Sequence, residues 1–359
     1  MHPLNDMGQL LNLSAYQSRA RSLLDPAIWQ YLEHGASEEI SLRANRTAFN
    51  NWDIPTRPLT NVNGGHTRQT LYGQELAHPI LLAPIAYQRL FHEQGESASA
   101  LAACAQGGQL LVSSLASQPL EYIAETSDSN LWFQLYWQGE RERTLRLLRR
   151  AEAAGYCAIV FTIDAPVKQA TLVLPAHIHS VNLESIPPYS AIKSDQSQVF
   201  DGWMAHAPTW DDVSWLRQQT QLPLILKGII HPDDADTALK LGCDGIIVSN
   251  HGGRVLDGTP ASLTMLPIIS QRIAGQIPIL FDSGIRNGRD IFKALALGAS
   301  AVLIGRPYIW GLASAGAMGV AHILRLMRDE LEMTMALSGC ATLSDINSSK
   351  LFSNPSNQP

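Results

Sequence analysis

Short apolar runs recur along the chain, and a longer stretch with leucine and alanine at helical spacing follows most of them. The runs show no alternation of apolar and polar positions, which is typical of strands covered on both faces, as in parallel sheets. Eight such strands are predicted, beginning at Ile80, Gln109, Leu131, Cys157, Leu222, Gly245, Ile277 and Ala301.

The stretches between the strands predict helices. The segment from Glu140 carries leucines on one face and arginines on the other. The segment from His231 opens with acidic residues and closes on Gly242, and a similar segment ends at Gly298. Eight strand–helix units predict an α/β protein with a closed TIM (β/α)8 barrel over residues 76–346. A doubly wound sheet is the alternative.

Three regions fall outside this repeat of strand–helix units. Residues 1–75 are predicted to form an N-terminal helical cap. Residues 167–210 form a long connection after the fourth strand, rich in proline, serine and histidine; a loop of this length is usually a lid or a disordered segment, and a lid is predicted. Residues 347–359 are expected to form a flexible tail.

Composition narrows the class of protein. The 359 residues carry a net charge of -6, which disfavours non-specific binding to nucleic acid. No apolar run reaches the roughly 18 residues of a membrane span, and the N-terminus lacks the layout of a signal peptide, so a cytoplasmic protein is predicted. The four cysteines are far apart without a CxxC pair, which predicts free thiols and no metal site.

Candidate chemistry lies where the strands end, because barrels of this kind place their active sites at the carboxyl ends of the strands. A strand end needs no polar side chain in order to fold, so polar residues there are informative. In the first half of the chain these positions hold Pro84, Ala86, Ser113, Ser114, Gln134, Tyr136, Thr162 and Asp164. In the second half they hold Lys227, Ser249, His251, Arg254, Asp282, Gly284, Arg286, Gly305 and Arg306.

The last two strand ends predict a phosphate site. FDSGIRNG follows the seventh strand and IGRP follows the eighth, and the loops after these two strands commonly bind phosphate in this fold. Glycine permits a close approach of the backbone, and a guanidinium matches phosphate oxygens in a bidentate fork. A turn glycine beside a solvated arginine is the alternative for either motif alone.

The segment SNHGGR predicts a catalytic base and an anion clamp. His251 can accept a proton near neutral pH, and Arg254 can bind a carboxylate. Asp164 could orient His251 and stabilise its protonated form. Lys227 would need an anionic partner if it were buried. The alternatives are a structural histidine, a turn aspartate and a lysine that extends to solvent.

Through LKG, IIVSNHGGR, FDSGIRNGRDIFKALALGASAVLIGRP and EMTMALSGC, the chain resembles the FMN-dependent 2-hydroxy-acid oxidases and dehydrogenases from about Leu24 to Ile346. The resemblance implies an FMN cofactor and oxidation of a small L-2-hydroxy acid to the 2-oxo acid. It further implies O2, a quinone or another carrier as electron acceptor, and a homotetramer. A non-redox FMN barrel of the isopentenyl-diphosphate-isomerase type and an FMN-binding barrel without activity are the alternatives.

The resemblance also assigns roles to individual residues. His251 would be the base, paired with Asp164. Tyr31 and Arg254 would bind the substrate carboxylate, and Tyr136 would contact the substrate near its hydroxyl. The residues that would hold FMN are Pro84, Ile85, Ala86, Ser113, Gln134, Thr162, Lys227 and Ser249 around the ring, and Asp282, Ser283, Gly284, Ile285, Arg286, Gly305 and Arg306 around the ribityl phosphate.

The chain departs from the family in the loop after the fourth strand. The family carries an arginine there that completes the carboxylate clamp, but this chain has none between Pro166 and Pro175. Lys168, His177 or His179 could substitute as cations. Ser283 and Val255 also replace usual family residues, a glycine and a glutamine, and Leu115 stands where some relatives carry an aromatic residue. These changes predict a weakened clamp and an altered choice of substrate.

Overall fold

The computed structural model describes residues 10–127, 131–166, 173–184 and 195–354. Eight parallel strands close into a barrel in the order β10-β11-β4-β5-β6-β7-β8-β9. The strands are β4 (Ile80–Leu82), β5 (Gln109–Ser113), β6 (Trp132–Leu135), β7 (Ala158–Thr162), β8 (Leu224–Ile229), β9 (Gly245–Val248), β10 (Ile279–Phe281) and β11 (Ala301–Ile304). All eight predicted strands are confirmed, and closure excludes the doubly wound alternative.

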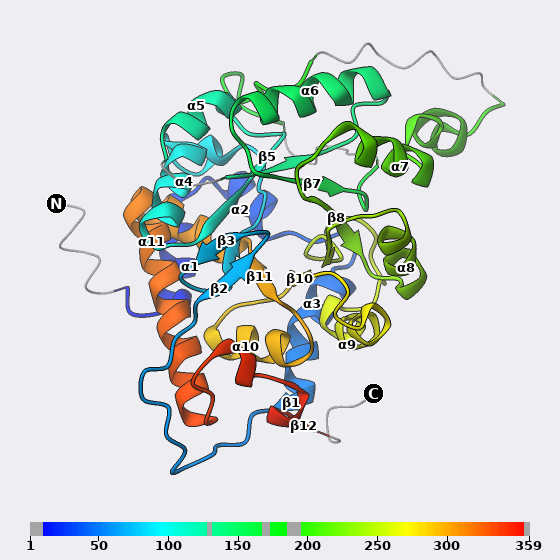
Figure 1. The fold of residues 1–359 in the computed structure, drawn as a ribbon. Helices are drawn as coiled ribbons and strands as arrows, with labels where there is room; N and C mark the ends of the chain where they lie inside the picture. The colour runs from blue at the N-terminus through cyan, green and yellow to red at the C-terminus, as the bar shows by residue number, and fades with distance from the viewer. Residues whose placement is uncertain (1–9, 128–130, 167–172, 185–194, 355–359) are drawn as a thin grey trace.

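Helices surround the barrel, as Figure 1 shows. They are α4 (Gly95–Ala105), α5 (Leu120–Glu125), α6 (Arg141–Ala153), α7 (Trp210–Gln219), α8 (Pro232–Lys240), α9 (Ser262–Ile273), α10 (Gly288–Ala296) and α11 (Arg306–Leu337). The side chain of Asn287 caps α10 by accepting from the N–H of Asp290. Gly242 and Gly298 follow α8 and α10 with positive φ, so the predicted ends of both helices are confirmed.

Two apolar layers hold the barrel together. Side chains inside the barrel form one cluster, which includes Leu81, Leu111, Trp132 and Ile225. The alternate residues of the same strands face outward and pack beneath the helices in a larger cluster. Because both faces of every strand are buried, the strands read as continuous apolar runs, which is why the sequence signal was clear.

The N-terminal region contains more than the predicted helices. Helices α1 (Leu13–Leu23), α2 (Pro26–Glu33) and α3 (Ile40–Thr47) lead into a 3-10 turn, Ala48–Asn51. A hairpin of β2 (Gln69–Leu71) and β3 (Gln74–Leu76) follows, and its Tyr72 ring packs edge-on against Trp132 at the amino ends of the strands. Strands of three residues are too short to produce a readable alternation, so the hairpin gave no sequence signal.

The C-terminal segment is ordered by pairing with the N-terminal region. Strand β12 (Phe352–Ser353) pairs antiparallel with β1 (Trp52–Asp53), so Trp52 lies opposite Ser353. The expectation of a flexible tail from residue 347 is therefore wrong as far as residue 354, because backbone pairing with the N-terminal region fixes it; residues 355–359 lie outside the described part.

Helix α11 is long and apolar enough to cross a membrane by length and composition alone, contrary to the expectation that no such stretch exists. Half of its most apolar window is buried inside the protein, and the backbone is non-helical at Ala315 and Gly316. The helix packs along α1 and α4, as the orange ribbon in Figure 1 shows. A buried core helix passes the same test, so this feature is weak evidence for a span.

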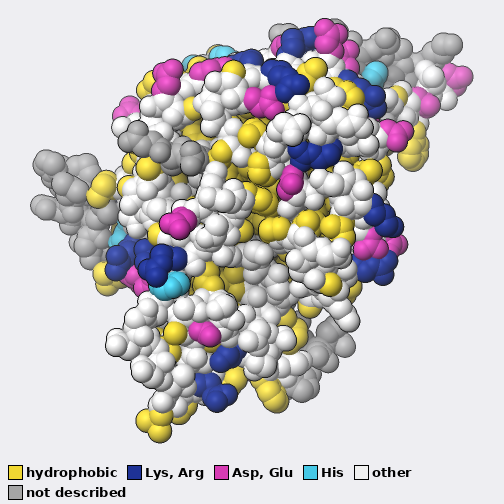
Figure 2. All heavy atoms as spheres, in the orientation of Figure 1, with side chains coloured by type: hydrophobic (Ala, Val, Ile, Leu, Met, Phe, Trp, Pro, Cys, Tyr) yellow, Lys and Arg dark blue, Asp and Glu magenta, His cyan; other side chains and the backbone are white. Residues whose placement is uncertain are grey.

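The connection after β7 is described over residues 173–184 and 195–210. The side chain of Asn182 accepts from the N–H of Leu120 at the start of α5 and donates to the carbonyl of Gln118. A π-helix (Gln198–Trp203) and a 3-10 turn (Met204–His206) then lead into α7. On the face in Figure 2, acidic and basic side chains are interspersed along the upper edge, where α6 lies. Lys168 lies outside the described residues.

Candidate active site

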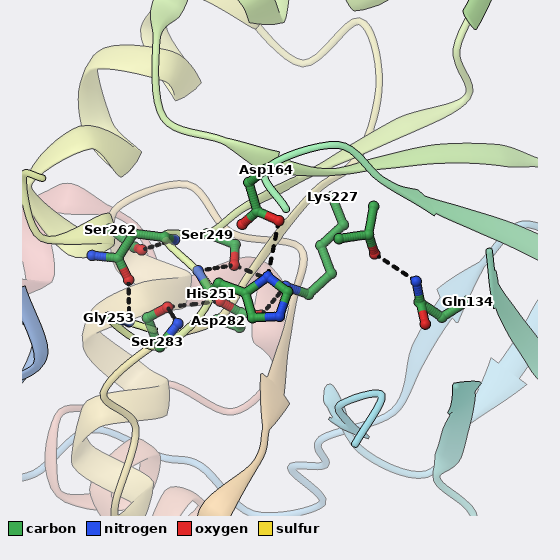
Figure 3. Close-up of polar contacts among 12 residues, drawn as sticks. Gln134, Asp164, Lys227, Ser249, His251, Gly253, Ser262, Asp282 and Ser283 are labelled. Atoms are coloured by element: carbon green, nitrogen blue, oxygen red, sulfur yellow. Dashed lines mark hydrogen bonds and ion pairs between the residues drawn. The ribbon is translucent and has the colours of Figure 1, made fainter. Parts of the chain in front are cut away.

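A histidine–aspartate pair lies at the carboxyl end of the barrel, as Figure 3 shows. The Nδ1 of His251 lies 2.9 Å from Oδ1 of Asp164, and the two side chains are 23% and 13% exposed. Asp164 follows β7 and packs against Gly228 of β8, where a Cβ atom would come within 2.5 Å of the carboxyl carbon. The pair fixes the orientation of the imidazole, and the carboxylate favours its protonated form.

Lys227 is buried at the carboxyl end of β8 and is paired within the protein. Its Nζ lies 3.0 Å from Oδ2 of Asp282 and donates to Oγ of Ser249 at 2.9 Å. Burial by itself lowers the pKa of Lys227, but the carboxylates of Asp282 and Asp164 outweigh that effect and raise the pKa above its ordinary value. Lys227 therefore remains a cation. The sequence analysis predicted that a buried Lys227 would need an anionic partner, and Asp282 is such a partner.

The ends of β8, β9 and β10 are joined by one closed ring of hydrogen bonds. The Oγ of Ser283 donates to Oδ1 of Asp282 at 2.8 Å and accepts from the N–H of Gly252 at 3.0 Å. The Oγ of Ser249 accepts from the N–H of His251 at 3.0 Å and from the lysine, and the backbone from His251 to Gly252 closes the ring. Ser283 has a φ of 87°, a left-handed value that suits the glycine of the family better than serine. The ring holds the loop that carries the histidine.

The structure alters the expectation for Asp282, which was grouped with the phosphate-binding residues. Its two carboxylate oxygens contact Lys227 and Ser283 instead. A carboxylate repels a phosphate, so we interpret Asp282 as the partner of Lys227. The backbone of residues 283–285 remains the candidate for binding the phosphate.

A row of buried amide and hydroxyl groups lines the opposite side of the barrel mouth. Nε2 of Gln134, on β6, donates to Oγ1 of Thr162 at 3.0 Å. Oε1 of Gln134 accepts from Oγ of Ser113 at 3.2 Å. Residues 84–86 follow β4, and the hydroxyl of Tyr308 donates to the carbonyl of Ala83 just before them. This row has both donors and acceptors, as the edge of an isoalloxazine ring requires.

Two arginines follow the last two strands, of which Arg306 is buried and Arg286 is partly buried. Burial, together with the charges of Arg286 and Arg254, lowers the pKa of Arg306 to about 9. Burial likewise lowers the pKa of Arg286 to about 10, and its guanidinium lies 5.2 Å from the centre of the Trp310 ring. The lowered pKa values mean that nearby carboxylates do not fully compensate the two guanidinium groups for their burial.

The backbone in the same region is accessible to a ligand. Helix α11 begins at Arg306, so its first N–H groups lie at this position, and a Cβ atom at Gly305 would meet nothing closer than 3.7 Å. One buried and one partly buried arginine, a helix N-terminus and accessible backbone together fit the phosphate of a cofactor.

Arg254, three residues after His251, lies beside Tyr31 of α2. The guanidinium carbon of Arg254 lies 5.2 Å from the centre of the Tyr31 ring. Its nitrogens also donate to the carbonyls of Tyr31, Leu32 and His34, at the end of α2. Arg306 donates to the carbonyls of Leu32 and His34 as well. Helix C-terminal carbonyls lack intrahelical partners, so α2 is fastened by both arginines.

Tyr136 belongs to the same cluster of side chains. Burial first, and then the charges of Asp164 and Tyr31, raise its pKa well above the ordinary value, so it stays neutral. Tyr136 thus lies within electrostatic reach of Asp164, Tyr31 and Arg254. His177 and His179 are exposed.

Two asparagines support the histidine loop without having been singled out in the sequence. Asn45 of α3 and Asn250 exchange side-chain hydrogen bonds at 2.7 and 3.0 Å. The Oδ1 of Asn250 also accepts from the N–H of Gly253. Asn250 adjoins His251 in the motif and could have been noticed there. Asn45 lies in a helix far along the chain, and only the fold shows its partner.

Among the residues that the structure describes, no group of three or more histidine, cysteine, aspartate and glutamate residues could hold a metal ion. The fold and the site together define a barrel enzyme that holds a phosphorylated cofactor beside a histidine base. The model of the FMN-dependent dehydrogenase family matches residues 20–353.

The chain is also similar to characterised proteins. L-lactate oxidase from Alicycliphilus denitrificans is 48% identical, over 93% of this chain and 94% of its own. Glycolate oxidase 1 from Oryza sativa subsp. japonica is 40% identical, over 96% of both chains. The crystal structure of mandelate oxidase with (S)-2-phenylpropionate superposes with a TM-score of 0.86 at 38% identity, over 96% of this chain and 98% of that one. The chain belongs to the FMN-dependent dehydrogenase family, and FMN is its cofactor.

Proposed function

We propose that this protein oxidises a small L-2-hydroxy acid to the 2-oxo acid and passes the electrons to O2, with release of hydrogen peroxide. The observation that carries the proposal is the His251–Asp164 pair at 2.9 Å, beside a region that holds Arg254 and Tyr31. Relatives named L-lactate oxidase and glycolate oxidase support the choice of substrate class and of O2 as acceptor.

The protein's own residues supply binding and proton transfer. Arg254 and Tyr31 bind the carboxylate of the acid, and Tyr136 contacts its hydroxyl. Since Nδ1 of His251 faces Asp164, its Nε2 is the nitrogen that accepts the proton from the substrate. Asp164 then stabilises the imidazolium. When bound, FMN supplies the two-electron acceptor.

The cofactor is held by three groups of residues. Residues 84–86 present backbone to the ring, and Ser113, Gln134 and Thr162 bind its polar edge. Lys227, held by Ser249, would stabilise the negative charge that the ring gains on reduction. The backbone of residues 283–285 and 305, with the side chains of Arg286 and Arg306, holds the phosphate.

A non-redox isomerase of the same fold is not favoured, because it has no use for a histidine base beside a carboxylate clamp, and the relatives are oxidases. We further propose a cytoplasmic homotetramer. The family resemblance supports the tetramer, and four free cysteines suit a reducing compartment. Sedimentation at several protein concentrations measures the oligomer directly, and a monomer would refute the tetramer.

The proposed reaction predicts a yellow protein that forms peroxide. We expect one FMN per chain and equal amounts of 2-oxo acid and hydrogen peroxide from at least one acid in a panel of L-2-hydroxy acids. Flavin absorbance and a coupled peroxidase assay measure both quantities. Substrate oxidation without peroxide, but with a quinone or another acceptor, would make the protein a dehydrogenase. A flavin that no acid reduces would refute the function.

A second prediction concerns the carboxylate clamp, which lacks the arginine after the fourth strand. A hydrogen bond to a charged group contributes about 1.5–3 kcal/mol, so its loss should raise the dissociation constant of a simple acid by roughly one to two decades. We therefore expect poor saturation by glycolate and lactate. Larger acids should compensate by burying apolar surface near Leu115 and Val255.

The measurement is a KM series over acids of increasing side-chain size, with the Lys168→Ala variant alongside. A raised KM in that variant would identify Lys168 as a substitute cation. Micromolar saturation by glycolate that the substitution leaves unchanged would show that the clamp is complete without this loop.

A further inference from the structure

Glu96 is a completely buried carboxylate that has no role in the proposed reaction. It lies in the first turn of α4, and burial of a carboxylate is costly unless hydrogen bonds satisfy it. Its Oε1 accepts from the N–H of Gln88 at 3.0 Å and from the N–H of Ser117 at 2.9 Å, and its Oε2 accepts from Oγ of Ser117 at 2.8 Å. Glu96 therefore joins the loop after β4 to the loop after β5.

The side chain of Gln88 belongs to a relay of hydrogen bonds that ends at the carbonyl of Ala83. Oγ of Ser99, three residues after Glu96 on α4, donates to Oε1 of Gln88 at 2.7 Å. Nε2 of Gln88 then faces Tyr308, whose hydroxyl accepts from it at 3.1 Å and donates to the carbonyl of Ala83 at 2.8 Å. Because all these side chains are buried, bulk water cannot replace a partner that is lost.

These contacts hold residues 84–86 on both sides. Ala83 directly precedes the segment, and its carbonyl accepts from Tyr308. Gln88 follows the segment, and its N–H donates to Glu96. Nε2 of Gln88 also reaches within 3.5 Å of the carbonyl of the middle residue of the three. The position of this stretch of backbone is therefore set by buried side chains of α4 and α11.

The same segment lies beside the proposed phosphate-binding backbone. A Cβ atom at Gly305 would come within 3.7 Å of Cδ1 of Ile85. Tyr308 lies two residues after Arg306, at the start of α11. The relay therefore connects the two stretches of backbone that the proposed function assigns to the flavin ring and to its phosphate.

We propose that Glu96, Gln88 and Tyr308 are positioning residues for the flavin, which hold the backbone of residues 84–86 where it meets the ring. The inference rests on the proposed function, which assigns this backbone to the ring, and adds the residues that fix its place. Gln88 and Tyr308 act through the carbonyl of Ala83, and Glu96 acts through the N–H of Gln88. A displacement of about 1 Å in an active site can cost roughly a hundredfold in rate.

Tyr308→Phe tests the relay, because it removes only the hydroxyl. Riboflavin carries the flavin ring without the phosphate, so its binding isolates the contacts with the ring. We expect the dissociation constants of the apoprotein for riboflavin and for FMN to rise by the same factor, roughly threefold to tenfold, the effect of one neutral hydrogen bond. Fluorescence titration measures both constants. Arg306→Ala should weaken the binding of FMN alone, which separates ring contacts from phosphate contacts.

Tyr156→Phe is the matched control. Tyr156 is also buried, and its hydroxyl donates to the carbonyl of Leu120 at 2.9 Å, but it lies between α6 and β7. Both variants should lower the free energy of unfolding of the apoprotein by a similar amount, and only Tyr308→Phe should lose riboflavin affinity. A riboflavin affinity in Tyr308→Phe equal to that in Tyr156→Phe overturns the proposal.

The holoenzyme gives a second readout. Tyr308→Phe should slow flavin reduction at saturating substrate by roughly tenfold or more, with a much smaller change in the dissociation constant of the substrate. Gln88→Met interrupts the same relay one step earlier, so the double variant should lose less than the sum of the two single free-energy effects. Additive losses, or a loss confined to substrate affinity, contradict the proposed role.

Two variants of Glu96 separate its position from its charge. Glu96→Ala removes both acceptor oxygens and should weaken riboflavin binding by roughly tenfold. Glu96→Gln keeps an oxygen that can accept from both N–H groups and adds an amide that can donate to Ser117, so it should restore most of the affinity. Equal losses in the two variants contradict a positioning role. If Glu96→Ala does not fold, Tyr308→Phe decides the matter. A wild-type apoprotein that binds neither riboflavin nor FMN would refute the proposed function instead.

Discussion

His251→Ala should retain FMN and lose nearly all flavin reduction by substrate. The histidine is needed to accept the substrate proton, and loss of a general base costs on the order of a hundredfold to ten-thousandfold in rate. Cofactor binding should persist, because the residues assigned to the phosphate are Arg286 and Arg306, on other loops. Anaerobic stopped-flow measurement of flavin reduction gives the rate, and absorbance gives the FMN content.

The backbone at position 251 calls for a second variant. His251 has a φ of 57°, which alanine tolerates less well than asparagine. His251→Asn removes the base and preserves that conformation, so it should lose the same activity without loss of stability. Asp164→Asn leaves the base in place but removes the charge that stabilises its protonated form, and we expect a smaller loss. Reduction of either His251 variant at close to the wild-type rate would exclude His251 from the mechanism.

Arg306→Ala should weaken FMN binding by roughly ten- to a hundredfold. A buried phosphate would lose a charge-assisted contact of about 1.5–3 kcal/mol. Fluorescence titration of the apoprotein with FMN measures the dissociation constant. Arg289→Ala is the matched control, since this arginine lies on the neighbouring α10 with its side chain 63% exposed and should leave the affinity unchanged.

Arg306 also donates to the carbonyls at the end of α2, so the variant needs a separate measurement of stability. The free energy of unfolding of the apoprotein reports the loss of these contacts. The gain in stability on addition of FMN reports the loss of the phosphate contact. Arg306→Lys keeps a charge without the bidentate fork and should fall between the two proteins. An FMN affinity equal to wild type in Arg306→Ala would remove Arg306 from the phosphate site.

The departures from expectation share one physical cause. The sequence predicted buried Lys227 to need an anion, but it did not indicate Asp282, which lies 55 positions along the chain and reaches the lysine only because β8 and β10 flank β9 in the barrel. The carbonyls of α2, which accept from Arg254 and Arg306, are backbone groups that every residue carries, so no residue type marks them.

The sequence by itself determined the barrel, its eight strands and the strand ends that carry chemistry. These follow from local rules: apolar runs buried on both faces, helix caps and glycines, and polar residues at positions where folding does not require them. It also placed His251, Asp164 and the Gly-Arg motifs at one end of the barrel, because parallel strands share a direction. Only the tertiary structure decided which side chains pair across strands and how α2 and the C-terminal strand pack, because those contacts depend on barrel closure and on the packing of distant segments.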